Sequence, residues 1–213
     1  MTRRSTGWWM GTAFVLAFCV AAVSLAVWGT GEKGIIAALR MTARLSFLLF
    51  WPAYVGSPLA ALLGPRFLPI KRRGRDLGLA FAAAQLVHAG LVAWLCVIGA
   101  APGAATFVIF GIALAFVYLL ALFSVDRIRQ AVGPSTWWVL RVVGMNYIAF
   151  AFTLDFWRGH PLTQVGDLIL YGPFLALSVA GILLNIVTLA LSVPWRSVFR
   201  RDVPRGAGKW DRT

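Results

Sequence analysis

Six long runs of apolar residues, separated by short polar segments, make up most of the chain. They extend over Trp8 to Trp28, Ala43 to Leu63, Leu77 to Gly99, Ala104 to Ser124, Trp137 to Trp157 and Leu168 to Val193. A helix of about 20 apolar residues is long enough to cross the hydrocarbon core of a bilayer. Barrel strands would instead alternate apolar and polar residues over shorter segments. The pattern therefore predicts an all-α integral membrane bundle of six transmembrane helices.

The polar segments divide the chain into three predicted parts. Residues 1–7 are expected to form a cytoplasmic N-terminus, 8–193 the six-helix transmembrane domain, and 194–213 a basic cytoplasmic tail. Within the domain, Gly64 to Asp76 is expected to be a basic loop. The short segment Ala100 to Gly103 is expected to make the third and fourth helices an antiparallel hairpin.

Proline marks one predicted irregularity. Pro52 and Pro58 both lie in the second apolar run. Proline removes a backbone donor from a helix interior and its ring clashes with the preceding turn. The second helix is therefore expected to kink or to break early.

Composition excludes a water-soluble globule. Hydrophobic residues make up 60% of the chain, charged residues only 13%, and mean hydropathy is +0.81. A soluble domain carries about 25% charged residues, so the bilayer must serve as solvent here. Cys19 and Cys96 lie in apolar runs and form no Cys-x-x-Cys pair, which favours packing residues over a zinc or dithiol site.

The net charge of +13 is explained by membrane topology, and it does not indicate nucleic-acid binding. With the N-terminus in the cytoplasm, 16 of the 20 Lys and Arg residues fall on the inner side. Only Lys33, Arg40, Arg44 and Arg158 fall on the outer side. Basic residues concentrate in cytoplasmic segments of membrane proteins, so both termini are predicted to be cytoplasmic, in a bacterial inner (plasma) membrane. The basic segments also suit anionic lipid headgroups.

His88 is the main candidate for chemistry within the membrane. It lies twelve residues after Asp76, which is about 18 Å along a helix axis. Ionisable residues at such depth are costly and face the bundle interior. Two interpretations stay open: a haem or metal ligand or proton relay, with Gln85 on the same helix face, and a neutral histidine hydrogen-bonded to another helix, with Asn146 as one partner.

Other polar residues carry weaker expectations. His160, in the segment Arg158 to Asp167, is either a solvated loop residue or a ligand. Asp155 and Arg158 are expected to pair near the outer surface. Asn146 and Asn185 are expected to form hydrogen bonds between helices.

A short motif precedes His88 and resembles one in a known family. The stretch Lys71-Arg72-Arg73-Gly74-Arg75-Asp76-Leu77-Gly78-Leu79 runs on to Leu86-Val87-His88, while Thr42-Ala43-Arg44 and Ser57-Pro58-Leu59 precede it. Together these resemble the ferric reductase-like transmembrane domain family, in particular the haem-binding membrane subunit of the methionine-sulfoxide reductase system. The resemblance covers about residues 35–190.

The resemblance implies a b-type haem held by histidines of the third and fifth helices, with His88 as one axial ligand. The fifth-helix ligands of the family fall here on Arg141 and Leu154, which do not ligate haem iron as histidine does. His160 is the only other histidine and the weaker ligand candidate.

Three functions follow from these observations. The first is a transmembrane redox subunit that passes electrons through haem from a cytoplasmic reductase partner or a quinol to an acceptor protein on the outer side. The second is a haem-less scaffold or interaction subunit of the same fold. The third, a small transporter, has only His88 and Asp155 to line a path. No catalytic residue of the chain itself is predicted, and any enzymatic activity would depend on the separate reductase partner.

Overall fold

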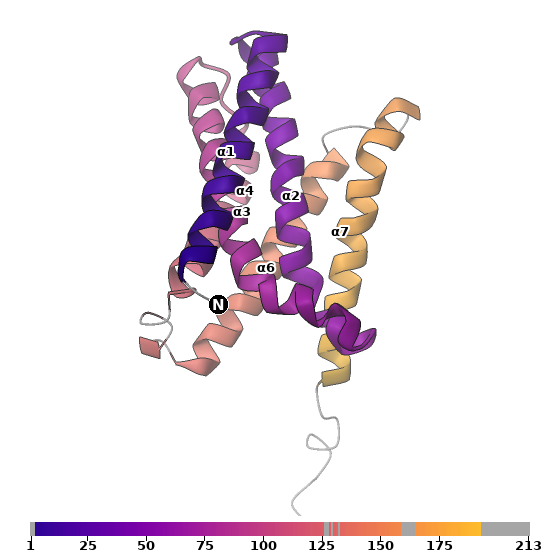
Figure 1. The fold of residues 1–213 in the computed structure, drawn as a ribbon. Helices are drawn as coiled ribbons and strands as arrows, with labels where there is room; N and C mark the ends of the chain where they lie inside the picture. The colour runs from indigo at the N-terminus through magenta and orange to yellow at the C-terminus, as the bar shows by residue number, and fades with distance from the viewer. Residues whose placement is uncertain (1–2, 126–127, 129, 132, 159–164, 193–213) are drawn as a thin grey trace, which may run out of the picture.

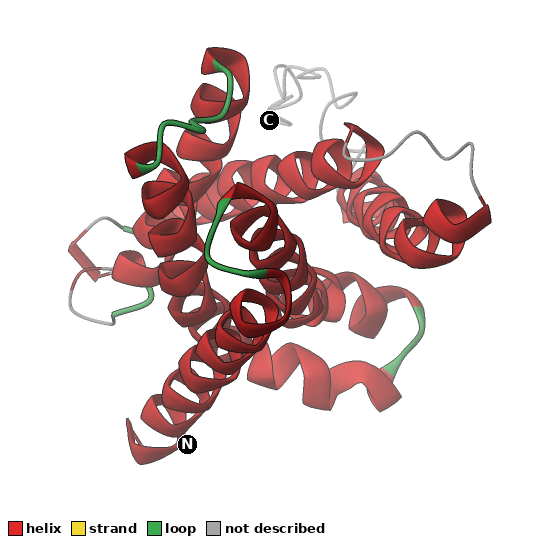
Figure 2. Cartoon of the chain, turned by 90° about the horizontal axis from the view of Figure 1, so that it is seen from above, coloured by secondary structure: helices red, strands yellow, loops and turns green. Residues whose placement is uncertain are grey.

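The computed structural model describes residues 3–125, 128, 130–131, 133–158 and 165–192. Every regular element in these residues is helical, and short loops join the helices (Figures 1 and 2). The elements are α1 (Arg3–Trp28), α2 (Glu32–Leu62), the 3-10 turn η1 (Pro65–Phe67), α3 (Leu68–Val97), α4 (Ala104–Phe123), α6 (Pro134–Arg158) and α7 (Val165–Ser192).

Six of these helical segments are long and apolar enough to cross a membrane, which agrees with the six predicted runs. Large apolar side chains lie exposed along the bundle, among them Val23 on α1, Val97 on α3 and Leu183 on α7. Such an exterior is unfavourable in water but is expected when lipid surrounds the helices. The chain is an integral membrane protein by this criterion.

One local prediction is wrong, and a second is wrong in part. The segment predicted as a basic loop, Gly64 to Asp76, contains η1 and the first turns of α3. Lys and Arg are good helix formers, and their long side chains extend toward water from a helix end in the headgroup region. The early break at Pro52 and Pro58 is also absent, because α2 continues through both prolines to Leu62, while the kink at these residues stays a prediction.

The turn between α1 and α2 depends on two glycines. Gly29 has a φ of +84°, a conformation that side chains other than glycine rarely adopt. A Cβ on Gly34 would lie 1.7 Å from the Gly29 carbonyl oxygen. The chain can therefore reverse direction closely at this point only because neither position carries a side chain.

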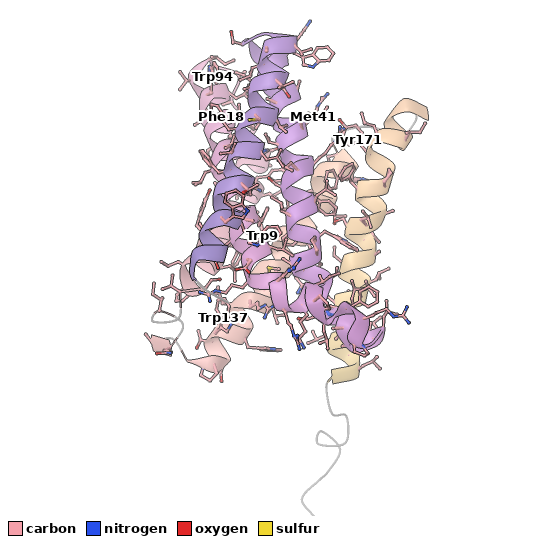
Figure 3. All side chains as sticks on the ribbon, in the orientation of Figure 1. Trp9, Phe18, Met41, Trp94, Trp137 and Tyr171 are labelled. Carbon is pink, nitrogen blue, oxygen red and sulfur yellow. The ribbon has the colours of Figure 1, made fainter. Side chains whose placement is uncertain are left out.

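Helix α2 occupies the centre of the bundle. It packs against α1 and α3 on one side and against α7 on the other, while α6 contacts α4 and α7 (Figure 1). The start of α1 lies at the same end as the α2–α3 connection. We call this the basic end, because its described cationic side chains are Arg66, Lys71, Arg72, Arg73, Arg75 and Arg141. Trp137 lies at the basic end and Trp94 at the opposite end (Figure 3), as interfacial tryptophans do.

Two kinds of packing hold the helices together. Small side chains, including Ala17 of α1, Ala38 of α2 and Ala84 of α3, are completely buried and let α1, α2 and α3 approach closely. An aromatic cluster joins α2, α3 and α6; its members are Phe47, Phe50, Phe81, Phe152 and Phe156. The core is therefore divided between an alanine-rich part and an aromatic part.

Candidate functional site

His88 is partly buried on α3 and faces α2. Its Nδ1 lies 3.0 Å from Oγ1 of Thr42, a side chain with no exposed surface. The hydrogen bond joins two helices, as one of the two interpretations of His88 requires. The partner is Thr42, whereas the sequence suggested Asn146.

The Thr42 hydroxyl also has a carbonyl acceptor within its own helix. Oγ1 of Thr42 lies 2.9 Å from the carbonyl oxygen of Ala38 and donates its single proton there. With its proton given to Ala38, the same oxygen can accept a hydrogen bond from His88 in the tautomer that carries Nδ1–H. In that tautomer, Nε2 is the nitrogen with the available lone pair.

More polar groups lie on the same two helices. Ser46 follows Thr42 by one turn of α2, and Gln85 precedes His88 by nearly one turn of α3. The Ser46 hydroxyl and Oε1 of Gln85 are buried without a hydrogen-bond partner among the described residues. The region between α2 and α3 thus contains a polar patch within an otherwise apolar bundle.

The aromatic cluster occupies the space between α3 and α6, where the resembled family holds its haem. Phe81 of α3 and Phe152 of α6 have ring centroids 6.0 Å apart. Phe50 lies against both rings, with centroids 5.3 Å from Phe81 and 5.6 Å from Phe152. The rings of Phe50, Phe81 and Phe152 therefore fill part of the space between α3 and α6.

The other family ligand positions do not complement His88. Leu154 is an apolar residue of α6, and Arg141 is an exposed residue near the basic end of that helix. His160 lies outside the described residues. No group of three or more His, Cys, Asp or Glu side chains that could hold a metal comes together in the described part of the chain. The side chains that are described do not fit a two-ligand haem site.

A buried arginine near the other end was not expected from the sequence. Arg44 is only 8% exposed, and its guanidinium carbon lies 4.4 Å from the ring centroid of Tyr171 and 5.8 Å from that of Phe174. Both rings belong to α7, so the contact depends on tertiary structure that a hydropathy pattern does not show.

Asp155 completes this charged region. The carboxylate interacts electrostatically with Arg40 and Arg44 of α2. Two cations of another helix thus act on this carboxylate, and the predicted pairing with Arg158 of its own helix stays a prediction. Charges placed this deep are stabilised by opposite charges and aromatic faces.

Asn146 forms the predicted bond between helices. Tyr54 of α2 donates its hydroxyl proton to Oδ1 of Asn146, at 2.8 Å. Asn185 instead donates to the carbonyl oxygen of Gly181 in its own helix. One of the two predicted interhelical asparagines is confirmed.

Two cavities lie toward the basic end. The first, of about 230 Å³, lies between α2, α3, α4 and α6, and Lys71, Arg72, Arg75 and Arg141 line it. We call it the basic cavity. The second, of about 430 Å³, lies between α2, α6 and α7, and we call it the lateral cavity. Arg141 and Met145 line both cavities.

The comparisons with known proteins add nothing to this geometry. No family model, no curated protein and no solved structure matches the chain. The resemblance to the ferric reductase-like family stays a prediction, and so does haem binding. What the chain does must be argued from its own side chains.

Proposed function

We propose that this protein is a haem-less scaffold or interaction subunit of a bacterial inner membrane. In this proposal its six helices form the membrane-embedded body. The observation that supports this most directly is the aromatic cluster between α3 and α6. Phe81 and Phe152 are in contact where the resembled family places its cofactor.

The hydrogen bonding and the surroundings of His88 also support the proposal. Its Nδ1 is hydrogen-bonded to Thr42, and the helices on this side of α3 are brought together by fully buried alanines such as Ala38 and Ala84. A histidine in this setting contributes one hydrogen bond between helices, of the kind that stabilises membrane bundles. This bond satisfies Nδ1 of His88 without a metal.

The proposed orientation places both termini in the cytoplasm. The basic end carries six described cationic side chains, and Lys33, Arg40 and Arg158 lie toward the opposite end. This asymmetry follows the rule that basic residues are retained on the cytoplasmic side. In intact cells, a membrane-impermeant thiol reagent should label Lys33→Cys and not Arg73→Cys, in a background without the native cysteines.

An absorbance spectrum tests the function. The full-length protein is purified in detergent from haem-sufficient cells and measured oxidised and then reduced with dithionite, beside His88→Ala. The proposal predicts no Soret band in either protein. A Soret band in the wild type that His88→Ala abolishes would overturn it.

The second candidate function is the haem-dependent redox subunit, and one observation favours it. In the tautomer of His88 that donates Nδ1–H to Thr42, the hydrogen bond orients the Nε2 lone pair, as in histidines that bind metals. A single axial histidine can hold haem. Electrons would then pass from a cytoplasmic reductase or quinol to an outer acceptor, and His160→Ala would test the second ligand.

A further inference from the structure

The basic cavity has the polarity gradient of a phospholipid. Its cationic residues come from the first turns of α3 and from Arg141 of α6. Its deeper wall is apolar and includes Phe81, Leu120 and Ile148. From Arg72 to Phe81 the wall extends nine residues, about 13 Å along a helix, so the cavity runs from a charged mouth into the depth of the bilayer.

Charge complementarity indicates an anionic occupant. Four cationic side chains line the cavity, and no acidic residue is among its described lining residues. Guanidinium groups present several donors that match phosphate oxygens. Basic pockets between transmembrane helices are typical sites for anionic lipid headgroups.

The two cavities share part of their lining on α6. Arg141 and Met145 stand one turn apart on α6 and line both cavities. The lateral cavity continues along α6 and α7 past apolar residues such as Val142, Ile186 and Leu189. A headgroup held at Arg141 therefore has an apolar surface on either side for acyl chains.

From this arrangement we infer that the basic cavity binds one anionic phospholipid of the surrounding leaflet. The phosphate lies against Arg141 and the cations of α3, and an acyl chain follows the apolar wall toward Phe81. Trp137, which also lines the cavity, lies at headgroup level. The site is independent of haem, so it holds whether or not the proposed function is correct.

Native mass spectrometry of the full-length protein in detergent tests the inference. The protein is incubated with phosphatidylglycerol or with phosphatidylcholine of the same acyl chains, and retained lipid is counted. We expect phosphatidylglycerol to bind more tightly. Arg141→Gln should weaken its binding about fivefold, since one cation near a lipid surface contributes about 1 kcal/mol. Arg141→Lys should retain the preference.

Two matched control variants test whether lipid retention depends on this cavity or only on surface charge and side-chain size. Arg73→Gln removes an exposed cation of the same helix segment that lines neither cavity, and it should bind as the wild type does. Gly78 lines the basic cavity, and a Cβ there meets no atom within 4 Å. Gly78→Leu should fill the space and reduce lipid retention without loss of charge, whereas Gly90→Leu, in open space on the same helix, should not.

The outcomes are decisive in both directions. Equal retention of the two lipids, or equal losses in Arg141→Gln and Arg73→Gln, would overturn the inference. Displacement of the lipid by free glycerol phosphate would show that the cavity takes a soluble phosphate compound, and this would also overturn the assignment to a lipid. Because Arg141 is exposed, Arg141→Gln is expected to fold. If Gly78→Leu fails to fold, the lipid binding of Arg141→Gln still tests the inference.

Discussion

The α1–α2–α3 unit and the region around α6 differ in how their helices pack. In the first, alanines such as Ala17, Ala38 and Ala84 are fully buried and the helices lie close together. Around α6, phenylalanine rings fill the middle of the bundle, and two cavities remain toward the basic end. His88, the ligand candidate of the sequence analysis, is in the tight part, and Arg141, which lines both cavities, is in the loose part.

The difference teaches that a membrane site requires space as well as suitable side chains. His88 has suitable chemistry but is engaged by Thr42. Arg141 stands where the resembled family has a histidine, yet it lies beside open volume and three more cations. The open volume beside cationic side chains therefore lies at the basic end and not beside His88.

Loss of a ring from the aromatic cluster should have the largest effect on stability. Phe47 is 1% exposed and contacts Phe152, Phe156 and Phe174 with centroids 5.1–6.0 Å apart. Phe47→Ala should destabilise the protein by about 3–5 kcal/mol, the range for deleting a buried aromatic ring. Thermal unfolding in detergent measures it. Phe150→Ala, on the outer face of α6, is the control, and an equal loss there would contradict the assigned core.

Added bulk should separate the tight part from the loose part. Ala84 has no exposed surface, so Ala84→Leu should cost about 1–3 kcal/mol through overpacking. Gly78→Leu, six residues earlier on the same helix, enters the basic cavity and should cost much less. Unfolding midpoints that fall equally for both variants would remove the contrast between the two parts.

The hydrogen bond between Thr42 and His88 should contribute less to stability than the packing changes above. A double-mutant cycle with Thr42→Val and His88→Leu isolates the interaction from the effect of each substitution. We expect a coupling energy of about 0.6–1.7 kcal/mol, as found for hydrogen bonds between membrane helices. Additive single effects would show that the bond contributes no stability.

The smallest loss of stability is expected for a hydrogen bond at the wall of the lateral cavity. Tyr54→Phe removes the hydroxyl that donates to Asn146 at 2.8 Å and leaves the ring in place. The change should cost about 0.6 kcal/mol, the average for such bonds. Tyr147→Phe, whose hydroxyl makes a 3.3 Å bond to the Ile109 carbonyl, should cost no more. A larger loss at Tyr147 would reverse the ranking.

The sequence predicts the six helices well because hydropathy reports directly on lipid exposure. It predicts their ends poorly: α2 begins at Glu32 and α3 at Leu68, outside the apolar runs. Helical structure continues into the headgroup region, where the charge of Lys71 or Arg72 has no large free-energy cost. Hydropathy therefore marks the hydrocarbon core and not the length of the helix.

The site was harder to predict, because it depends on how the helices pair. His88 stands out by composition alone, but only the register of α2 against α3 places Thr42 opposite it. Arg141 stands out as a departure from the family pattern, while its approach to Lys71 and Arg72 of α3 requires the folded bundle. A single sequence carries the residue types and not their tertiary neighbours.

The most direct test of this contrast is the accessibility of two engineered cysteines in a background with Cys19→Ala and Cys96→Ala. Gly78→Cys opens into the basic cavity, and Ser46→Cys replaces a fully buried hydroxyl on α2. An anionic, water-soluble thiosulfonate should label Gly78→Cys readily in the folded, detergent-purified protein and Ser46→Cys only after denaturation. Equal labelling of both in the folded state would contradict the account of a sealed interior beside an open basic end.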